Sequence, residues 1–151
     1  MELLSPASLE EAADCVRSAS ADKAPLEILG ASSKRGFGRP VDAAKQLTTA
    51  AMSGIVSYHP EELVLVARAG THMDEIAAAL EEKNQQLAFE PPDFGKLYPG
   101  DDAGSNRTGT IGGILATNLS GPRRFKAGAA RDHFLGFTAV NGRGEIFKGG
   151  G

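Results

Sequence analysis

Cysteine is almost absent from this sequence, because Cys15 is the single cysteine among 151 residues. A lone cysteine excludes an internal disulfide and a multi-cysteine metal or iron–sulfur site, and it favours an intracellular compartment. The residues from Met1 to Pro6 lack the basic start and long apolar run of a signal peptide, and no run is long enough to span a bilayer. We therefore expect a soluble, cytoplasmic protein without a transmembrane segment.

A strong charge of either sign is also missing. The chain has 16 basic and 19 acidic residues and a net charge of -3, and its basic residues are dispersed rather than gathered into a stripe. This pattern argues against a nucleic-acid partner. With 41% hydrophobic residues the chain can bury a core, which excludes intrinsic disorder and allows one domain or two small lobes.

Glycine, by contrast, is abundant. The 19 glycines are nearly twice the roughly 7% of average usage. They concentrate in two loops and at the C-terminal end, where three glycines follow Lys148 directly after an expected strand. We interpret this end as that of a chain that stops within a domain.

Two helices are expected in the first half of the chain. The S-x-x-E pattern of a capping box at Ser8, followed by apolar residues at helical spacing, predicts a helix near residues 8–19. A similar pattern at Thr71 predicts a second capped helix, with an apolar stripe from Met73 and an end by Asn84.

Three short segments of the first half are expected to be strands, at residues 26–29, 54–58 and 63–69. The last is apolar almost throughout, so we expect it to be buried on both faces. Together the three segments predict a small sheet covered by helices. The first strand leads into a small-residue loop at residues 30–38.

An irregular stretch of about twenty residues lies between Phe89 and Gly109, long enough to suggest a functional or mobile segment. It predicts a boundary between a first α/β lobe, residues 1–88, and the incomplete start of a second α+β lobe, residues 89–151. The second lobe is expected to contain a short helix at 110–119 and a hairpin of strands at 134–140 and 145–147, joined at 141–144.

The first glycine-rich loop, from Gly30 to Ser33, has the composition of an anion site. Backbone N–H groups converge there without side-chain obstruction, and the hydroxyls of Ser32 and Ser33 add donors, which suits a diphosphate. The loop lacks the dinucleotide-binding fingerprint, because Arg39 and Pro40 follow Gly38, and it lacks the Walker lysine pattern. Alone, it is also consistent with an ordinary surface loop.

The second glycine-rich segment, from Gly109 to Gly121, alternates apolar residues with glycine, alanine and hydroxyl residues. A helix here can pack closely on one side and offer backbone donors from its N-terminus to a phosphate or a polar ring edge. The alternative is a close helix–helix contact through small residues.

Some polar residues resemble site residues but have simpler explanations. His59, His72 and His133 lack a second ligand at metal-binding spacing, so we expect no metal site. Asp101 and Asp102 lie in a Gly/Ser-rich stretch, which is typical of a solvated turn rather than of an acid–base pair.

The basic residues Arg123, Arg124 and Lys126 follow Pro122. They can offset the charge of a cofactor diphosphate, face a partner subunit, or form a solvated basic loop. From the sequence we favour the solvated loop.

Five motifs follow one another along the chain: Gly30-Ala-Ser-Ser-Lys, the run Val64 to Gly70 before a helix, Glu90-Pro-Pro, Gly109-Thr-Ile-Gly-Gly, and Ser120-Gly-Pro-Arg-Arg followed by Gly128 and Arg131-Asp132. They occur in the order found in FAD-binding domains of the vanillyl-alcohol-oxidase (PCMH) type, and the whole chain resembles the N-terminal portion of that domain. More narrowly, the motifs around Glu90, Gly121 and Arg131 resemble the FAD-binding E subunits of bacterial glycolate oxidases.

The resemblance implies an α+β domain of two lobes with FAD between them. FAD should be non-covalent, because the histidine that some relatives use for attachment is absent from the first loop. Relatives also have a third glycine-rich section and a substrate-covering domain after the point that corresponds to Gly151. The residues implied in FAD binding are Gly30, Ala31, Ser32, Ser33 and Lys34 at the pyrophosphate; Pro91, Gly109, Thr110, Ile111, Gly112 and Gly113 from the other lobe; Ala116, Thr117, Ser120 and Gly121 along the flavin end; and Gly128 and Asp132 completing the cleft.

The function implied is that of an FAD-dependent oxidoreductase subunit, which oxidises a small 2-hydroxy acid such as glycolate to glyoxylate and passes electrons to an iron–sulfur partner subunit. Any association with the inner face of the membrane would occur through such partners.

One alternative is a non-catalytic FAD-holding assembly or electron-relay subunit, because these residues offer no convincing base or carboxylate clamp. Another is the FAD subunit of a molybdenum hydroxylase, which the stretch Arg131-Asp132-His133 does not favour. We expect the catalytic residues to lie beyond Gly151, and the 151 residues alone to be inactive and to bind little FAD.

Overall fold

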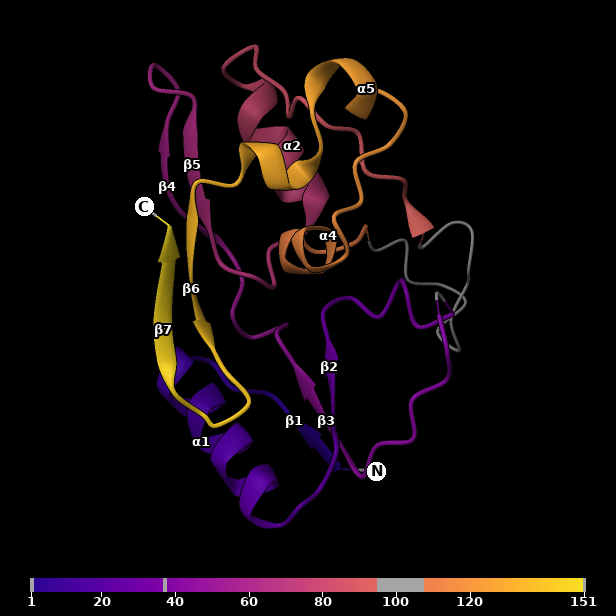
Figure 1. Ribbon diagram of the computed structural model, residues 1–151. Helices are drawn as coiled ribbons and strands as arrows, with labels where there is room; N and C mark the ends of the chain where they lie inside the picture. The colour runs from indigo at the N-terminus through magenta and orange to yellow at the C-terminus, as the bar shows by residue number, and fades with distance from the viewer. Residues whose placement is uncertain (1, 37, 95–107, 151) are drawn as a thin grey trace.

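Small sheets and short helices form an α+β fold in the computed structural model, which describes residues 2–36, 38–94 and 108–150 (Figure 1). The first helix, α1 (Leu9–Ala21), begins at Ser8, whose side-chain oxygen accepts a hydrogen bond from the backbone N–H of Glu11 at 3.1 Å. The sequence prediction of a capped helix at this position is confirmed.

A parallel sheet stands at one end of the molecule. It consists of β1 (Glu2–Leu4), β2 (Leu26–Leu29) and β3 (Lys45–Thr48) in the order β1-β3-β2. The prediction of strand 26–29 is confirmed, whereas β1 and β3 were not expected. Both are short and carry polar residues, so their pattern alone does not distinguish them from loops.

The strands β4 (Ile55–His59) and β5 (Val64–Ala67) form a separate antiparallel hairpin. The expectation of one sheet that combines these strands with β2 is therefore wrong. The expectation that segment 63–69 is buried on both faces is also wrong, because Leu63 and Val66 are exposed. A hairpin of two strands has few neighbours to cover its second face.

The helix α2 (Met73–Glu81) ends before Asn84, as predicted, but it is not capped by Thr71. Its N-cap is His72, which makes no side-chain capping bond. Thr71 is fully buried instead, and its hydroxyl donates to the carbonyl of Arg68 at 2.7 Å and accepts from the N–H of Gly54 at 2.9 Å. The hydroxyl thus ties the start of the β4–β5 hairpin to its end.

The second half of the chain supplies α4 (Ile111–Thr117), α5 (Arg124–Ala127), the 3-10 helix η1 (Ala130–His133), and the hairpin of β6 (Gly136–Val140) and β7 (Ile146–Gly150). The short helix and the hairpin confirm the sequence predictions. The first strand of the hairpin begins two residues later than expected, because Phe134 caps η1.

Figure 1 shows α4 at the centre of the molecule, between the parallel sheet and α2. The core around it contains buried Phe89, Ile114 and Ala130. The hairpin β6–β7 packs against α1, where the guanidinium of Arg17 donates to the carbonyl of Gly144 at 2.6 Å. Elements from both ends of the sequence are therefore in contact.

Replacing Thr71 with valine should lower the free energy of unfolding by about 1–3 kcal/mol, because the N–H of Gly54 would lose its acceptor while the side-chain volume is conserved. Urea unfolding would measure this loss, provided that the dependence of the unfolding free energy on urea concentration (the m-value) is the same in both proteins. The matched control is Thr138→Val on the exposed face of β6, which should stay within about 0.5 kcal/mol of the unchanged protein. Equal losses in the two variants would contradict the role assigned to Thr71.

Candidate functional site

A backbone pairing fixes the start of α4. The N–H of Ile111 donates to the carbonyl of Thr71 at 2.9 Å, and the N–H of Gly112 donates to the carbonyl of Ala69 at 3.0 Å. These two first-turn donors are therefore already used within the chain. Their bonds hold α4 in one position relative to α2, and the expected donation from this helix start to a phosphate or a ring edge would have to come from other groups.

Thr110 links this helix to the first glycine-rich loop. Its side chain is almost completely buried, and its Oγ1 accepts the N–H of Gly113 at 3.3 Å as the N-cap of α4. A Cβ atom at Gly30 would lie only 2.3 Å from that oxygen. Glycine is thus required at position 30 because the loop backbone approaches the capping hydroxyl so closely.

A pocket of about 350 Å³ lies between the loop after β2 and one face of α4. It brings together more than half of the residues expected at the cofactor. Those that line it are Gly30, Ala31, Ser32, Ser33 and Lys34 from the loop, and Thr110, Gly113, Ala116 and Thr117 from the helix and its cap.

Lys34 extends from the loop toward the start of α4. Its Nζ lies 3.0 Å from the position that a Cβ of Gly109 would occupy and 3.4 Å from that of Gly113, so both glycines leave room for the ammonium group. Burial lowers the pKa of Lys34, and the negative charge of Asp93 opposes this effect only in part. An anion in the pocket would therefore stabilise the charged form of Lys34.

The remaining expected residues lie outside this pocket. Gly112 packs against the backbone of Ala69, since a Cβ there would come within 2.7 Å of the Ala69 carbonyl oxygen. Gly121 has a φ of +67° and packs even more closely against the backbone of Glu90, next to Pro91. The hydroxyl of buried Ser120 accepts the N–H of Ala130 at 2.8 Å. The contacts of Ser120 and Gly121 make the turn after α4 tightly packed.

Gly128 and Asp132 meet in the turn that follows α5. Asp132 accepts the N–H of Ala129 at 2.8 Å through Oδ2, the oxygen that lies 3.2 Å from a Cβ position at Gly128. Gly128 also has a φ of +87°, in the region that favours glycine. The structure thus brings these two residues together as expected, but apart from the pocket.

Sequence reasoning missed several polar residues of the pocket. Arg35 makes a two-point ion pair with Glu27, at 3.1 Å for both contacts, and Gln46 donates to the same carboxylate at 2.6 Å. Arg39 also lines the pocket. The signal available in the sequence was the presence of three basic residues within or directly after the glycine-rich loop.

The rings of two of the three histidines have structural partners. Nδ1 of His72 lies 2.8 Å from the carbonyl of Thr108, and Nε2 of His133 lies 2.7 Å from the carbonyl of Ala127. Within residues 2–36, 38–94 and 108–150, no group of three or more His, Cys, Asp or Glu side chains is arranged to hold a metal, and no helix is long and apolar enough to cross a membrane. Asp101 and Asp102 lie outside the described residues.

Comparison with known proteins gives concordant matches. A family profile described as "FAD binding domain" matches residues 2–150. Glycolate oxidase subunit GlcE of Escherichia coli strain K12 is 41% identical over 136 residues, which cover 90% of this chain and 35% of that protein. D-lactate dehydrogenase of Anaerostipes hadrus is 29% identical over 147 residues, which cover 97% of this chain and 28% of that protein. The chain thus spans well under half the length of these relatives.

A solved structure of Phl p 4, a grass pollen allergen with glucose dehydrogenase activity, matches with a TM-score of 0.74 at 13% identity. The match covers 97% of this chain and 28% of that one. At this identity it shows the fold alone, and it agrees with the α+β class expected from the sequence.

Replacing Gly30 with alanine should destabilise the protein by about 1–3 kcal/mol, because the added methyl group overlaps with the hydroxyl of Thr110. Urea unfolding would measure the loss, and Gly142→Ala is the control, since nothing lies within 4 Å of a Cβ there. When Thr110 is also replaced with alanine, the Gly30 substitution should lower the free energy of unfolding by a smaller amount. An equal loss of stability with and without the Thr110 hydroxyl would contradict the proposed contact between Gly30 and Thr110.

The stability of the protein should also depend on pH through Lys34. The folded protein, in which the pKa of Lys34 is lowered, binds fewer protons than the unfolded chain between that lowered pKa and 10.5. The unfolding free energy of the unchanged protein should therefore rise, relative to that of Lys34→Met, as the pH increases through this window. Denaturant unfolding at neutral pH and at pH 10.5 would measure the difference, with Lys148→Met in β7 as the control. A difference in unfolding free energy between the unchanged protein and Lys34→Met that does not vary with pH would refute this prediction.

Proposed function

Because the chain belongs to the FAD binding domain family, we propose that it is the FAD-binding part of an oxidoreductase subunit that oxidises a small 2-hydroxy acid. Glycolate and D-lactate, which appear in the names of two relatives, are both 2-hydroxy acids. The observation that carries the proposal is the pocket in which the loop after β2 meets α4. The size and charge of its lining residues can be compared with those of the diphosphate of FAD.

The pocket fits the diphosphate of FAD. Its loop is made of small residues, it leaves no room for a Cβ at Gly30, and it presents the cations of Lys34 and Arg39, whereas Arg35 is paired with Glu27. A diphosphate would offset the charge of these groups, and it would stabilise the protonated form of Lys34. We assign the diphosphate to residues 30–34 and the adjoining part of non-covalently bound FAD to the α4 face.

The other expected residues have two proposed roles. Gly109, Ile111 and Gly112 position α4, because their backbone contacts are made within the chain. We retain the proposal that the second lobe, residues 89–151, borders FAD opposite the first lobe, residues 1–88. In this proposal the flavin end and the cleft are lined by Pro91, Ser120, Gly121, Gly128 and Asp132.

When bound, FAD supplies the two-electron redox chemistry of the reaction. The residues of this chain would bind and orient the cofactor. We propose that the substrate is glycolate, that the product is glyoxylate, and that electrons leave toward a partner subunit that holds an iron–sulfur group. The word "subunit" in the name of the relative from Escherichia coli supports a multi-subunit assembly.

One observation favours a second candidate function, that of a subunit that holds FAD and relays electrons without oxidising the substrate. Among the described residues that line the pocket, the single carboxylate is that of Glu27, and Arg35 and Gln46 occupy it. None of the described pocket residues therefore offers a free carboxylate as a base for the oxidation of a 2-hydroxy acid. In this alternative a related subunit would bind the 2-hydroxy acid.

The full-length protein, purified gently, should be yellow with flavin absorbance bands and should show dye-linked glycolate oxidation when its partner subunits are present. Ala116→Leu, which fills the pocket from the exposed side of α4, should weaken FAD binding at least about tenfold. The control is Ala78→Leu on the exposed side of α2. A colourless protein that never takes up added FAD would exclude both functions, whereas a flavin-containing protein whose complex oxidises glycolate through another subunit would leave only the relay.

A further inference from the structure

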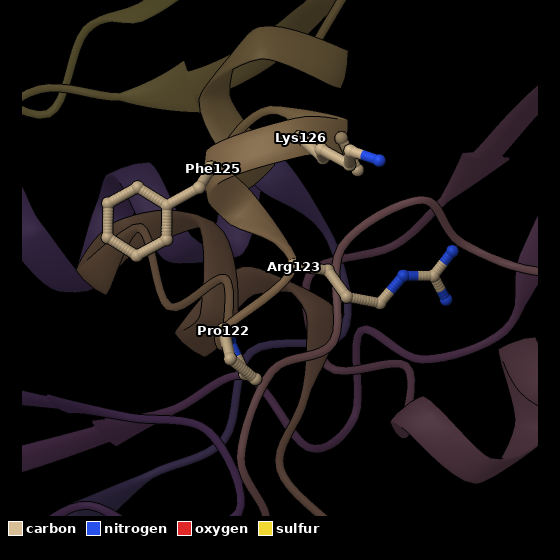
Figure 2. A pocket seen from close by; sticks show the side chains of 5 residues that line it. Pro122, Arg123, Phe125 and Lys126 are labelled. Atoms are coloured by element: carbon tan, nitrogen blue, oxygen red, sulfur yellow. The ribbon is translucent and has the colours of Figure 1, made fainter.

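The short helix α5 carries an aromatic side chain in an unusual position. Phe125 is 93% exposed, the most exposed of the large hydrophobic side chains in the described part of the chain. Figure 2 shows its ring projecting away from the ribbon, on the other side of the helix from Lys126. Full exposure of a phenylalanine is unfavourable unless another surface covers it.

Basic residues flank Phe125 in the sequence. Residues 122–134 contain four basic residues, Arg123, Arg124, Lys126 and Arg131, and one acidic residue, Asp132, in a chain whose net charge is -3. The even dispersal expected from the sequence therefore has a local exception at α5. Arginine and aromatic side chains are enriched at the centre of protein–protein interfaces.

The turn that carries Phe125 is tied to its neighbours at both ends. The guanidinium of Arg123 lies 3.3 Å from the carboxylate of Glu90, and Gly121 packs against the Glu90 backbone. At the other end, Nε2 of His133 lies 2.7 Å from the carbonyl of Ala127. Because the turn is already ordered, binding through it costs little conformational entropy.

The same segment borders a shallow, open hollow of about 370 Å³, lined by Pro122, Arg123, Phe125, Lys126 and Ala127 (Figure 2). A hollow of this size takes one or two side chains of a partner. The carboxylate of Glu90 pairs with Arg123 at its border, so this border carries charges of both signs. A protein surface, unlike a membrane, can place its carboxylates opposite the basic residues alone.

We propose that α5 is a docking site for a partner protein subunit that presents carboxylates around an apolar socket for Phe125. Phe125 fills the socket, and Arg124 and Lys126 pair with the carboxylates. The choice of a partner subunit rests on the multi-subunit function proposed above. The docking site lies outside the pocket between the loop after β2 and α4. Because Gly121 and Gly128 on either side of it are proposed to border the flavin, the flavin content of the α5 variants has to be measured as well.

A photo-crosslinking amino acid at position 125 of the full-length protein, in the complex isolated from the cells that make it, tests the contact. Mass spectrometry should identify crosslinks to a segment of another subunit rich in aspartate and glutamate. The same amino acid at position 148, on exposed β7, serves as the control. Crosslinks to this polypeptide itself, to a second copy, to lipid, or to nothing would overturn the proposal.

Charge reversal provides the second arm. Arg124→Glu with Lys126→Glu, and separately Phe125→Ser, should weaken the association with that subunit about thirtyfold or more, and added salt should weaken it in the unchanged protein. Arg143→Glu with Lys148→Glu makes the same change of charge on the β6–β7 hairpin and should leave association unchanged. Binding to phosphatidylglycerol vesicles that the α5 variants abolish would overturn the proposal in favour of a membrane.

Flavin absorbance separates this proposal from the one it rests on. The α5 variants should retain the flavin content of the unchanged protein, and a loss of flavin in them would overturn the docking role by placing α5 at the cofactor. An unchanged protein without flavin would refute the proposed function, whereas the crosslinks and the charge reversal would still decide the docking contact.

Discussion

The backbone pairing between the residues that precede α4 and those that precede α2 is the constraint on which the rest of the structure depends. Through it, the carbonyls of Ala69 and Thr71 hold the first turn of α4, and His72 and Thr110 form a β-bridge. Without these bonds the helix start would leave buried donors unpaired. With them, the capping hydroxyl of Thr110 lies at the one place where the loop after β2 can contact it.

The same arrangement creates an electrostatic imbalance. The loop carries Lys34 into a partly desolvated position, and Arg35 is neutralised by Glu27 whereas Arg39 borders the open pocket. The folded chain therefore bears a cost of desolvation that an anionic cofactor would offset. Binding of such a cofactor would in turn stabilise the folded state, because the loop and α4 come together only in that state.

The features that the sequence predicted are local ones. The capped start of α1, the strand β2, the helix α4 and the β6–β7 hairpin each depend on residues that are neighbours in the chain. The pairing of β1 and β2 with β3, and the use of the Thr71 hydroxyl by Gly54, depend on distant residues and left no periodic signal. At the site, the two glycine-rich segments were identified by their composition and their order. Their meeting at Thr110 joins residues 80 positions apart, and the Glu27–Arg35 pair depends on the path of the loop, so neither followed from pattern alone. The roles of the individual FAD-binding residues stay predictions.

The contact between Arg17 and Gly144 joins residues 127 positions apart. At a synthesis rate of roughly 5–20 residues per second, α1 leaves the ribosome about 6–25 s before the hairpin that covers it. For that interval one face of α1 has no native partner to pack against. The helix is thus made early and covered late, which makes this part of the chain a natural client of the chaperones that shield nascent polypeptides.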